Sequence, residues 1–205
     1  MFYNREQREA LRIVRRHLDA LTAEGRSALS DRIGAYLSFR EALETFLFEH
    51  FSEICTAACF RSRLSACCTK EGIVAFFGDV VVNALASSAA QLDEMERALA
   101  ADSNGFKCVF LSEKGCLWQV RPIVCAMFLC DPAAEKAWSK APEAAARWKS
   151  FEARRKDFTW PDKPVLFDEL EQYFIDAGLR SPLMYLHQSP GLLRVKKTAG
   201  LLPER

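Results

Sequence analysis

The sequence predicts a mainly α-helical fold with one small β-hairpin in a cysteine-rich middle. Three observations point to this class. Apolar residues recur every three or four positions over long stretches at both ends of the chain, which is the period of a helix. Two short β-rich runs flank a glycine-containing turn near residue 114. All eight cysteines lie between residues 55 and 130, so the middle of the chain differs in chemistry from its ends.

Two amphipathic helices are expected before the first cysteine. Residues 4–22 place Leu11, Val14 and Leu18 at steps of three and four. A Glu-Gly pair interrupts this pattern, and residues 27–51 then form a second apolar stripe. We expect these two cysteine-free helices to form a hairpin that packs over the cysteine-rich region.

The middle of the chain is expected to contain shorter elements. The apolar, β-branched run before residue 86 fits helix or strand by pattern alone, and we favour a helix. A proline after Arg121 suits the first turn of a further helix, which Asp131-Pro132 should end. The expected elements are helix 79–86, helix 91–101, a hairpin with strands 107–111 and 116–120, and helix 123–129.

The C-terminal third is again expected to be helical. Residues 164–177 place Leu166, Leu170 and Phe174 on one face, and Gly178 sits where a helix C-cap belongs. A short helix should begin at Ser181-Pro182 and end before Pro190. Five aromatic residues precede this region, and we expect core packing of them rather than a pocket. They are Trp138, Trp148, Phe151, Phe158 and Trp160.

Length and charge limit the classes of function. At 205 residues the chain is expected to be one integrated domain with three regions. These are an N-terminal helical hairpin (1–52), a cysteine-cluster metal-binding region (53–132) and a C-terminal helical region (133–205). The 28 basic and 27 acidic residues nearly balance, which gives no reason to expect nucleic acid or a membrane surface as a partner. No apolar run approaches the length needed to cross a bilayer.

The cysteines point to a soft-metal site. The sequence opens without the apolar segment of an export signal, so we expect a cytoplasmic protein whose thiols stay reduced. Thiolates suit zinc or an iron–sulfur cluster far better than magnesium or calcium. Four disulfides, or cysteines acting only as small buried hydrophobes, are the weaker alternatives. The candidate metal ligands are Cys55, Cys59, Cys67, Cys68, Cys108, Cys116, Cys125 and Cys130.

The spacing of the cysteines suggests how some of them meet. Cys55 and Cys59 would share one side of a helix. Cys67 and Cys68 are adjacent, so their side chains should diverge. Cys108 and Cys116 flank the hairpin turn and could converge across it. Two four-cysteine sites, or one cluster with spare cysteines, both fit the count of eight.

Other residues near the cysteines have alternative roles. Arg121, Lys107 and Lys114 could offset the negative charge of a thiolate centre, or could be ordinary surface charges. Asp79 and Asp131 could orient ligands, although helix capping is the safer interpretation. The histidines are more typical of packing than of ligation, with His50 the better ligand candidate because it precedes Cys55 by five positions. The other two are His17 and His187.

One segment also resembles a known family. In order it contains Cys108, Gly115-Cys116, Trp118, Arg121-Pro122, Cys125, Phe128 and Cys130. This pattern resembles the second half of the YkgJ-type cysteine-cluster family, described as a zinc- or iron-chelating domain. The first half would be Cys55, Cys59 and Cys67-Cys68, followed by Ile73 and Asp79. The resemblance covers roughly residues 55–130, with a wider spacing before the double cysteine and Trp118 where tyrosine is more usual.

The resemblance implies chelation of zinc or an iron–sulfur cluster by the cysteines. Some relatives in that family are flagellin lysine N-methylases, a branch with which an iron–sulfur centre is associated. The sequence itself contains no glycine-rich nucleotide loop after a strand and no radical S-adenosylmethionine cysteine spacing. It therefore leaves two hypotheses: a metal-binding protein with a redox or methyl-transfer role, and a non-enzymatic scaffold with a structural zinc core and a protein partner.

Overall fold

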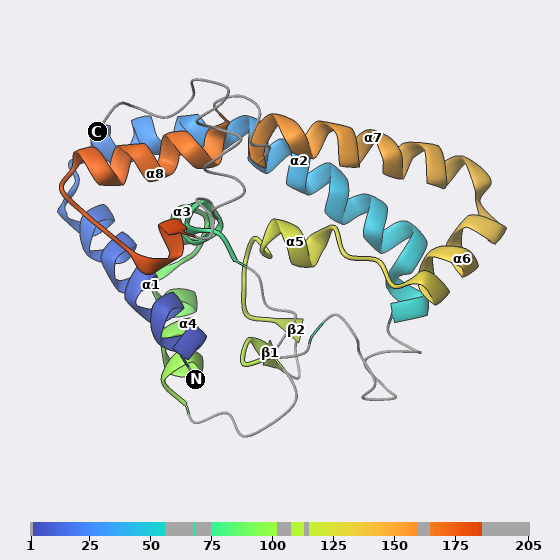
Figure 1. The fold of residues 1–205 in the computed structure, drawn as a ribbon, viewed down its shortest axis with the longest axis horizontal. Helices are drawn as coiled ribbons and strands as arrows, with labels where there is room; N and C mark the ends of the chain where they lie inside the picture. Colours follow the sequence, from blue (N-terminus) through green and yellow to red (C-terminus); the bar gives the residue numbers. More distant parts are fainter. Residues whose placement is uncertain are drawn as a thin grey trace.

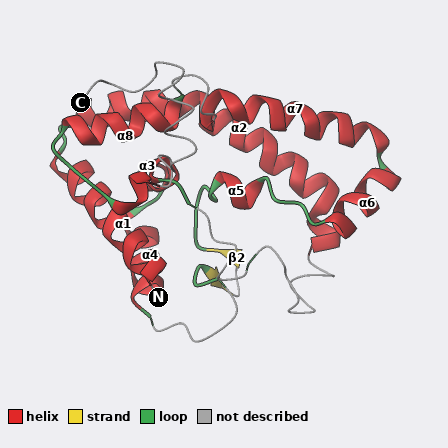
Figure 2. Ribbon diagram, viewed as in Figure 1, coloured by secondary structure: helices red, strands yellow, loops and turns green. Residues whose placement is uncertain are grey.

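The computed structural model describes residues 2–55, 68, 75–101, 108–112, 115–159 and 165–185, and within them the fold is mainly helical. The helical elements are α1 (Phe2–Ala20), α2 (Ala23–Cys55), α3 (Phe77–Ala86), α4 (Ala89–Ala100), α5 (Ile123–Ala126), α6 (Asp131–Lys140), α7 (Pro142–Thr159), α8 (Leu166–Asp176) and the 3-10 turn η2 (Pro182–Tyr185). Strands β1 (Leu111–Ser112) and β2 (Gly115–Cys116) form one antiparallel pair. Figure 2 shows this pair as the single small sheet of the described chain. The predicted class, mainly α with a small hairpin, is therefore confirmed.

The two N-terminal helices form where the sequence predicts them but do not form a hairpin. Helix α1 packs against α3, α4 and η2, whereas α2 packs against α6 and α7. Figure 1 shows α1 and α2 diverging from their short connection toward opposite ends of the molecule. The expectation was wrong because each apolar stripe is covered by helices that come later in the chain, which sequence periodicity does not identify.

Helix α3 lies between α1 and α8. Eight of its ten residues are buried, so it lacks the one-sided pattern of a surface helix. It packs against α1 and α8. A Cβ atom added to Gly78 would lie 2.5 Å from Cγ of Phe167, so glycine is what allows α3 and α8 to approach this closely.

An aromatic layer joins α2 to α7 along the other end of the molecule. The Phe46 ring lies 5.3 Å from that of Phe151 and 6.0 Å from that of Trp148, and the Phe39 and Phe158 rings stack at 5.3 Å. Trp148 and Phe151 are buried, and Trp138 and Phe158 pack against the core. The expected core role of these aromatic residues is confirmed, while Trp160 lies outside the described residues.

The remaining predicted elements differ mainly at their ends. The cap at Gly178 is confirmed, with a φ of 77° and a hydrogen bond of 2.9 Å from Leu179 N to Phe174 O. Asp131-Pro132 stops the preceding segment by starting α6, with proline in its first turn. Helix α5 is one turn long, shorter than predicted, and each strand has two residues. Among the described helices, none is long and apolar enough to cross a membrane.

Candidate metal centre

The β-hairpin brings two of the predicted ligands to one place. Leu111 pairs with Cys116 and Ser112 with Gly115, and Gly115 has a φ of +107° that other residues rarely adopt. A turn precedes β1, in which Leu111 N donates to Cys108 O at 3.1 Å. The negative charge of Cys116 raises the pKa of Cys108, so the two thiols lie close enough for their charges to interact. The convergence of their sulfur atoms on one metal stays a prediction.

Backbone amides surround these two sulfur atoms. The N–H groups of Phe110 and Leu111 donate to the sulfur of Cys108, and the N–H of Trp118 donates to that of Cys116. Each of these hydrogen bonds favours the thiolate and lowers the pKa of the cysteine that accepts it. Donors aimed at sulfur are also a means by which proteins support thiolate-bound metals.

Two further cysteines join this pair from distant parts of the chain. Cys108 N donates to Cys68 O at 2.9 Å, which fixes Cys68 beside the start of the hairpin. Cys125 lies on α5, and the charges of Cys108, Cys116 and Cys68 all raise its pKa. Cys68 also raises the pKa values of Cys108 and Cys116. Cys68, Cys108, Cys116 and Cys125 therefore form a thiol cluster in which every pair interacts.

Burial favours the protonated thiols of Cys108, Cys116 and Cys125. It raises the pKa of Cys108 to about 11 and that of Cys125 to about 12. Burial of its sulfur also raises the pKa of Cys116, although the residue as a whole is exposed. Such thiols are poor nucleophiles at neutral pH. A soft metal would have to displace their protons, so metal affinity should rise with pH.

An ion-pair network from α2 holds the segment between Cys116 and Cys125. Arg121 binds Glu44 through both ends of its guanidinium, with Nη2 at 2.6 Å from Oε2 and Nε at 3.3 Å from Oε1. The buried Arg40 donates to the Arg121 backbone carbonyl at 2.6 Å and to Glu44 Oε1 at 3.2 Å. The pKa of Arg121 is raised by Glu44 and, to a smaller extent, by Cys116 and Cys125. The guanidinium therefore lies between Glu44 and two thiols.

Two buried polar residues of α3 fix the same segment from the other side. Asp79 accepts hydrogen bonds from Phe76 N at 2.9 Å and from Ile123 N at 3.0 Å. It thus caps α3, as expected, and also caps α5. Burial raises the pKa of Asp79 to about 7. Asn83 accepts from Val120 N at 3.0 Å. Sequence reasoning missed Asn83, although an asparagine within the apolar run of α3 was a signal of a buried polar contact.

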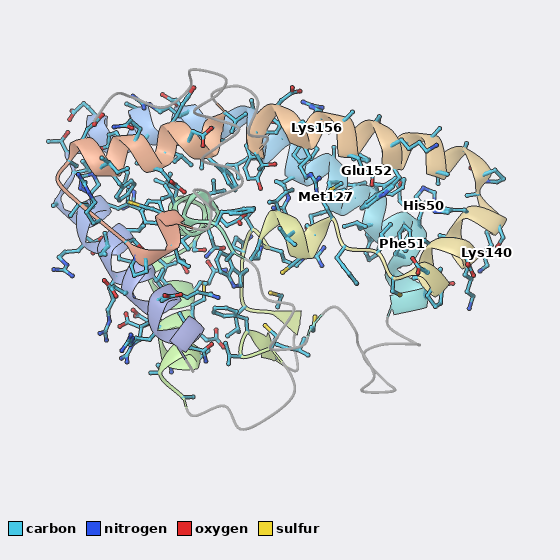
Figure 3. The ribbon with its side chains drawn as sticks, viewed as in Figure 1. His50, Phe51, Met127, Lys140, Glu152 and Lys156 are labelled. Atoms are coloured by element: carbon cyan, nitrogen blue, oxygen red, sulfur yellow. The ribbon has the colours of Figure 1, made fainter. Side chains whose placement is uncertain are left out.

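The other predicted ligands and neighbours are elsewhere or outside the described residues. Cys130 is the N-cap of α6, and Cys55 is the last residue of α2. His17 Nε2 lies 3.1 Å from the Tyr173 hydroxyl, a packing role. The His50 ring contacts that of Phe46 in a tilted arrangement with ring centroids 4.7 Å apart, and Figure 3 places His50 toward α6, away from the hairpin. Cys59, Cys67, Lys107, Lys114 and His187 lie outside the described residues.

The described side chains do not form a coordination sphere. Within the described part of the chain, no group of three or more His, Cys, Asp or Glu side chains is arranged as metal ligands. The segment does contain residue types that thiolate metal sites use, namely cysteines, backbone amides directed at sulfur and an arginine.

Comparisons with known proteins add no family. No family model matches the sequence, and neither curated proteins nor solved structures gave a match. The resemblance to the YkgJ-type family therefore stays a prediction.

Proposed function

We propose that this chain is a metal-binding protein in which Cys68, Cys108, Cys116 and Cys125 hold one zinc ion or one iron–sulfur cluster. The observation that supports this proposal is the backbone geometry of the segment: Cys108 N donates to Cys68 O at 2.9 Å, Leu111 pairs with Cys116, and Cys125 follows on α5. Cysteines that served only as small hydrophobes would have no need of amide donors directed at their sulfur atoms.

A zinc centre and an iron–sulfur cluster would have different roles. Four thiolates leave zinc without an open coordination position, so a zinc centre would be structural. An iron–sulfur cluster in the same place could carry electrons. Either group would need the four thiols to lose their protons, and the chain supplies amide hydrogens and Arg121 to favour the thiolates. The methyl-transfer chemistry of some relatives in the resembled family stays a prediction.

The number of remaining cysteines is enough for a second metal centre. Two four-cysteine sites need eight cysteines, and the other four are Cys55, Cys59, Cys67 and Cys130. Cys130 follows Cys125 by five positions and precedes α6. A second site built from these residues stays a prediction.

Metal analysis of protein purified without oxygen tests the proposal. Zinc, iron and acid-labile sulfide are measured. Absorption at about 400 nm, which arises from iron–sulfur charge transfer, separates an iron–sulfur cluster from a zinc centre. Cys125→Ser and Cys116→Ser should each remove the same metal, and the double variant should remove no more than either single variant. Cys130→Ser, outside the cluster, should retain that metal. Unchanged metal content in Cys125→Ser would refute the assignment.

A scaffold role is the second candidate, and one observation favours it. Phe128 is 48% exposed and lies between Cys125 and Cys130, and Phe48 of α2 is 74% exposed. Single exposed hydrophobic side chains are normal on a protein surface, so this candidate requires that the two belong to one contiguous apolar patch. A colourless protein that contains zinc would favour this candidate over redox work.

A further inference from the structure

Helix α1 presents a row of arginines at the molecular surface. Its apolar side chains, among them Leu11, Val14 and Leu18, are buried against the rest of the molecule. The arginines follow one another at steps of three and four, so they are neighbours along one side of the helix. They are Arg5, Arg8, Arg12 and Arg16. With a helical rise of about 1.5 Å per residue, the row extends for about 16 Å.

These arginines line a hollow in the surface. Its volume is about 510 Å³, and its lining also includes the acidic residue Glu9 and the apolar residue Ile13. Ile13 is partly buried and packs against the core. Arginine has a planar guanidinium that can bind a carboxylate through two hydrogen bonds, which lysine cannot do. The hollow therefore combines several such guanidinium groups with one apolar contact.

The neighbouring carboxylates of α4 neutralise this row only in part. Arg15 donates to Asp93 at 2.6 Å and to Glu96 at 3.3 Å, and Arg12 also binds Glu96. Arg8 Nε lies 3.8 Å from Glu96 Oε1, too far for a hydrogen bond, and this buried atom has no hydrogen-bond partner among the described residues. Three guanidinium groups thus share two carboxylates, which leaves positive charge uncompensated at this surface.

We infer that this arginine row is a docking surface for an acidic helix of a partner protein. A helix whose Asp or Glu residues recur at steps of three and four repeats its charges at the same spacing as the arginines. Guanidinium groups of the row then bind carboxylates of the partner, and Ile13 contacts an apolar side chain between them. Arginine is enriched in protein interfaces for this reason. The inference does not depend on the proposed metal centre.

The carboxylates in and beside the row favour a protein over a nucleic acid as the partner. Glu9 lies among the arginines, and Asp93 and Glu96 lie beside them. A phosphate backbone is charged at every nucleotide and would meet these carboxylates, whereas a protein helix can place a neutral or basic side chain opposite each one. A membrane surface is disfavoured because the apolar face of α1, which would have to enter it, is buried in the core.

Binding of a synthetic helix to the reduced full chain tests this inference. The probe is a fluorescently labelled, alanine-rich peptide of about four turns with glutamate at steps of three and four. The same peptide with glutamine in place of glutamate is its control. Fluorescence anisotropy at low salt measures both dissociation constants. The glutamate peptide should bind, and its affinity should fall as salt is added, whereas the glutamine peptide should not bind.

Two double variants with the same net charge separate this surface from charge in general. Arg8→Gln/Arg16→Gln removes two positive charges from the row, and Arg26→Gln/Arg155→Gln removes two from α2 and α7. The first should weaken binding of the glutamate peptide about 3–10-fold, as expected for two partly exposed ion pairs, and the second should leave it nearly unchanged. Arg8→Lys/Arg16→Lys should retain part of the affinity, because it keeps the charges without the planar guanidinium.

Each outcome decides the inference. Weaker binding by the α1 double variant alone supports it. Absence of binding, equal binding of the two peptides, or equal weakening by the two glutamine double variants overturns it. Tighter binding of a single-stranded oligonucleotide of the same charge than of the glutamate peptide would also overturn it. If Arg8→Gln/Arg16→Gln fails to fold by circular dichroism, comparison of Arg8→Lys/Arg16→Lys with Arg26→Lys/Arg155→Lys gives the same decision.

Discussion

At the scale of single residues, a buried carboxyl group makes the stability of the fold depend on pH. Burial raises the pKa of Asp79 from 3.8 to about 7, so the folded chain retains this proton between about pH 4 and pH 7 while the unfolded chain loses it. The free energy of unfolding therefore falls as pH rises through that window. Above about pH 7 this contribution does not change further. The total is on the order of 4 kcal/mol, since each unit of pKa corresponds to about 1.4 kcal/mol.

Asp79→Asn should remove this dependence at the cost of a hydrogen bond. The single oxygen of an amide can accept from only one of Phe76 N and Ile123 N. The free energy of unfolding of the variant is therefore lowered by about 1–3 kcal/mol at every pH. The metal-free variant should therefore be less stable than the unmodified chain at pH 4, and the difference should shrink or reverse by pH 7. Denaturant unfolding at both pH values measures this change, and a constant difference would contradict the assigned burial.

Residue type predicted part of the site and missed another part. The cysteines were candidates because thiols bind soft metals, and two of the four cluster members, Cys108 and Cys116, could be related by spacing. Glu44 and Arg40 could not be found in this way, because polar residues on helices usually face solvent. Only the tertiary structure shows that Arg40 is buried and that Glu44 meets Arg121 across 77 positions of sequence.

At the scale of elements, the contact between α3 and α8 can be tested with glycine. Gly78→Ala would place a Cβ atom 2.5 Å from Phe167 Cγ, so the ring or the helix must move. We expect a net destabilisation of about 1–3 kcal/mol from overpacking, despite the better helix propensity of alanine. Gly34→Ala on α2 is the control, because nothing lies within 4 Å of its added Cβ. The free energy of unfolding of Gly34→Ala should rise by about 0.5–1 kcal/mol. Thermal unfolding of both variants checks that their stabilities change in opposite directions. Equal changes in stability for Gly78→Ala and Gly34→Ala would show that the close approach of α3 to α8 does not require glycine.

Element prediction succeeded where apolar side chains are large. Helices α4 and α8 have Leu, Met or Phe among their buried residues, α4 begins at the Ser88 cap, α8 is followed by Gly178, and both were located. Helices α6 and α7 were not located as such. Their buried positions include Ala133, Ala137 and Ala144, which give a weak apolar pattern because alanine buries little surface. The prolines that start these helices also resemble loop signals in sequence.

At the scale of the whole molecule, regular structure and thiol chemistry are segregated. The long helices lie around the outside in Figure 1, while β1, β2 and α5 lie between them. A strand pair of two residues each and a helix of four residues cannot be stable by themselves. Hydrogen bonds from Asp79, Asn83 and Arg40 attach this segment to α2 and α3. Under the proposed function, the metal would provide the rest of its stability.

Removal of the metal should therefore loosen the segment from Cys108 to Ala126 while the helical frame persists. A thiolate-bound zinc can contribute on the order of 10 kcal/mol, comparable to the total stability of a domain. Hydrogen exchange of the loaded protein, compared with protein treated with a chelator under reducing conditions, measures the effect by region. Amides such as Phe110, Leu111 and Trp118 should lose protection, whereas those of α1 and α7 should change little. If protection of the hairpin amides is the same in both samples, the sulfur atoms are not what holds this part of the molecule together, because those amides are the ones directed at sulfur.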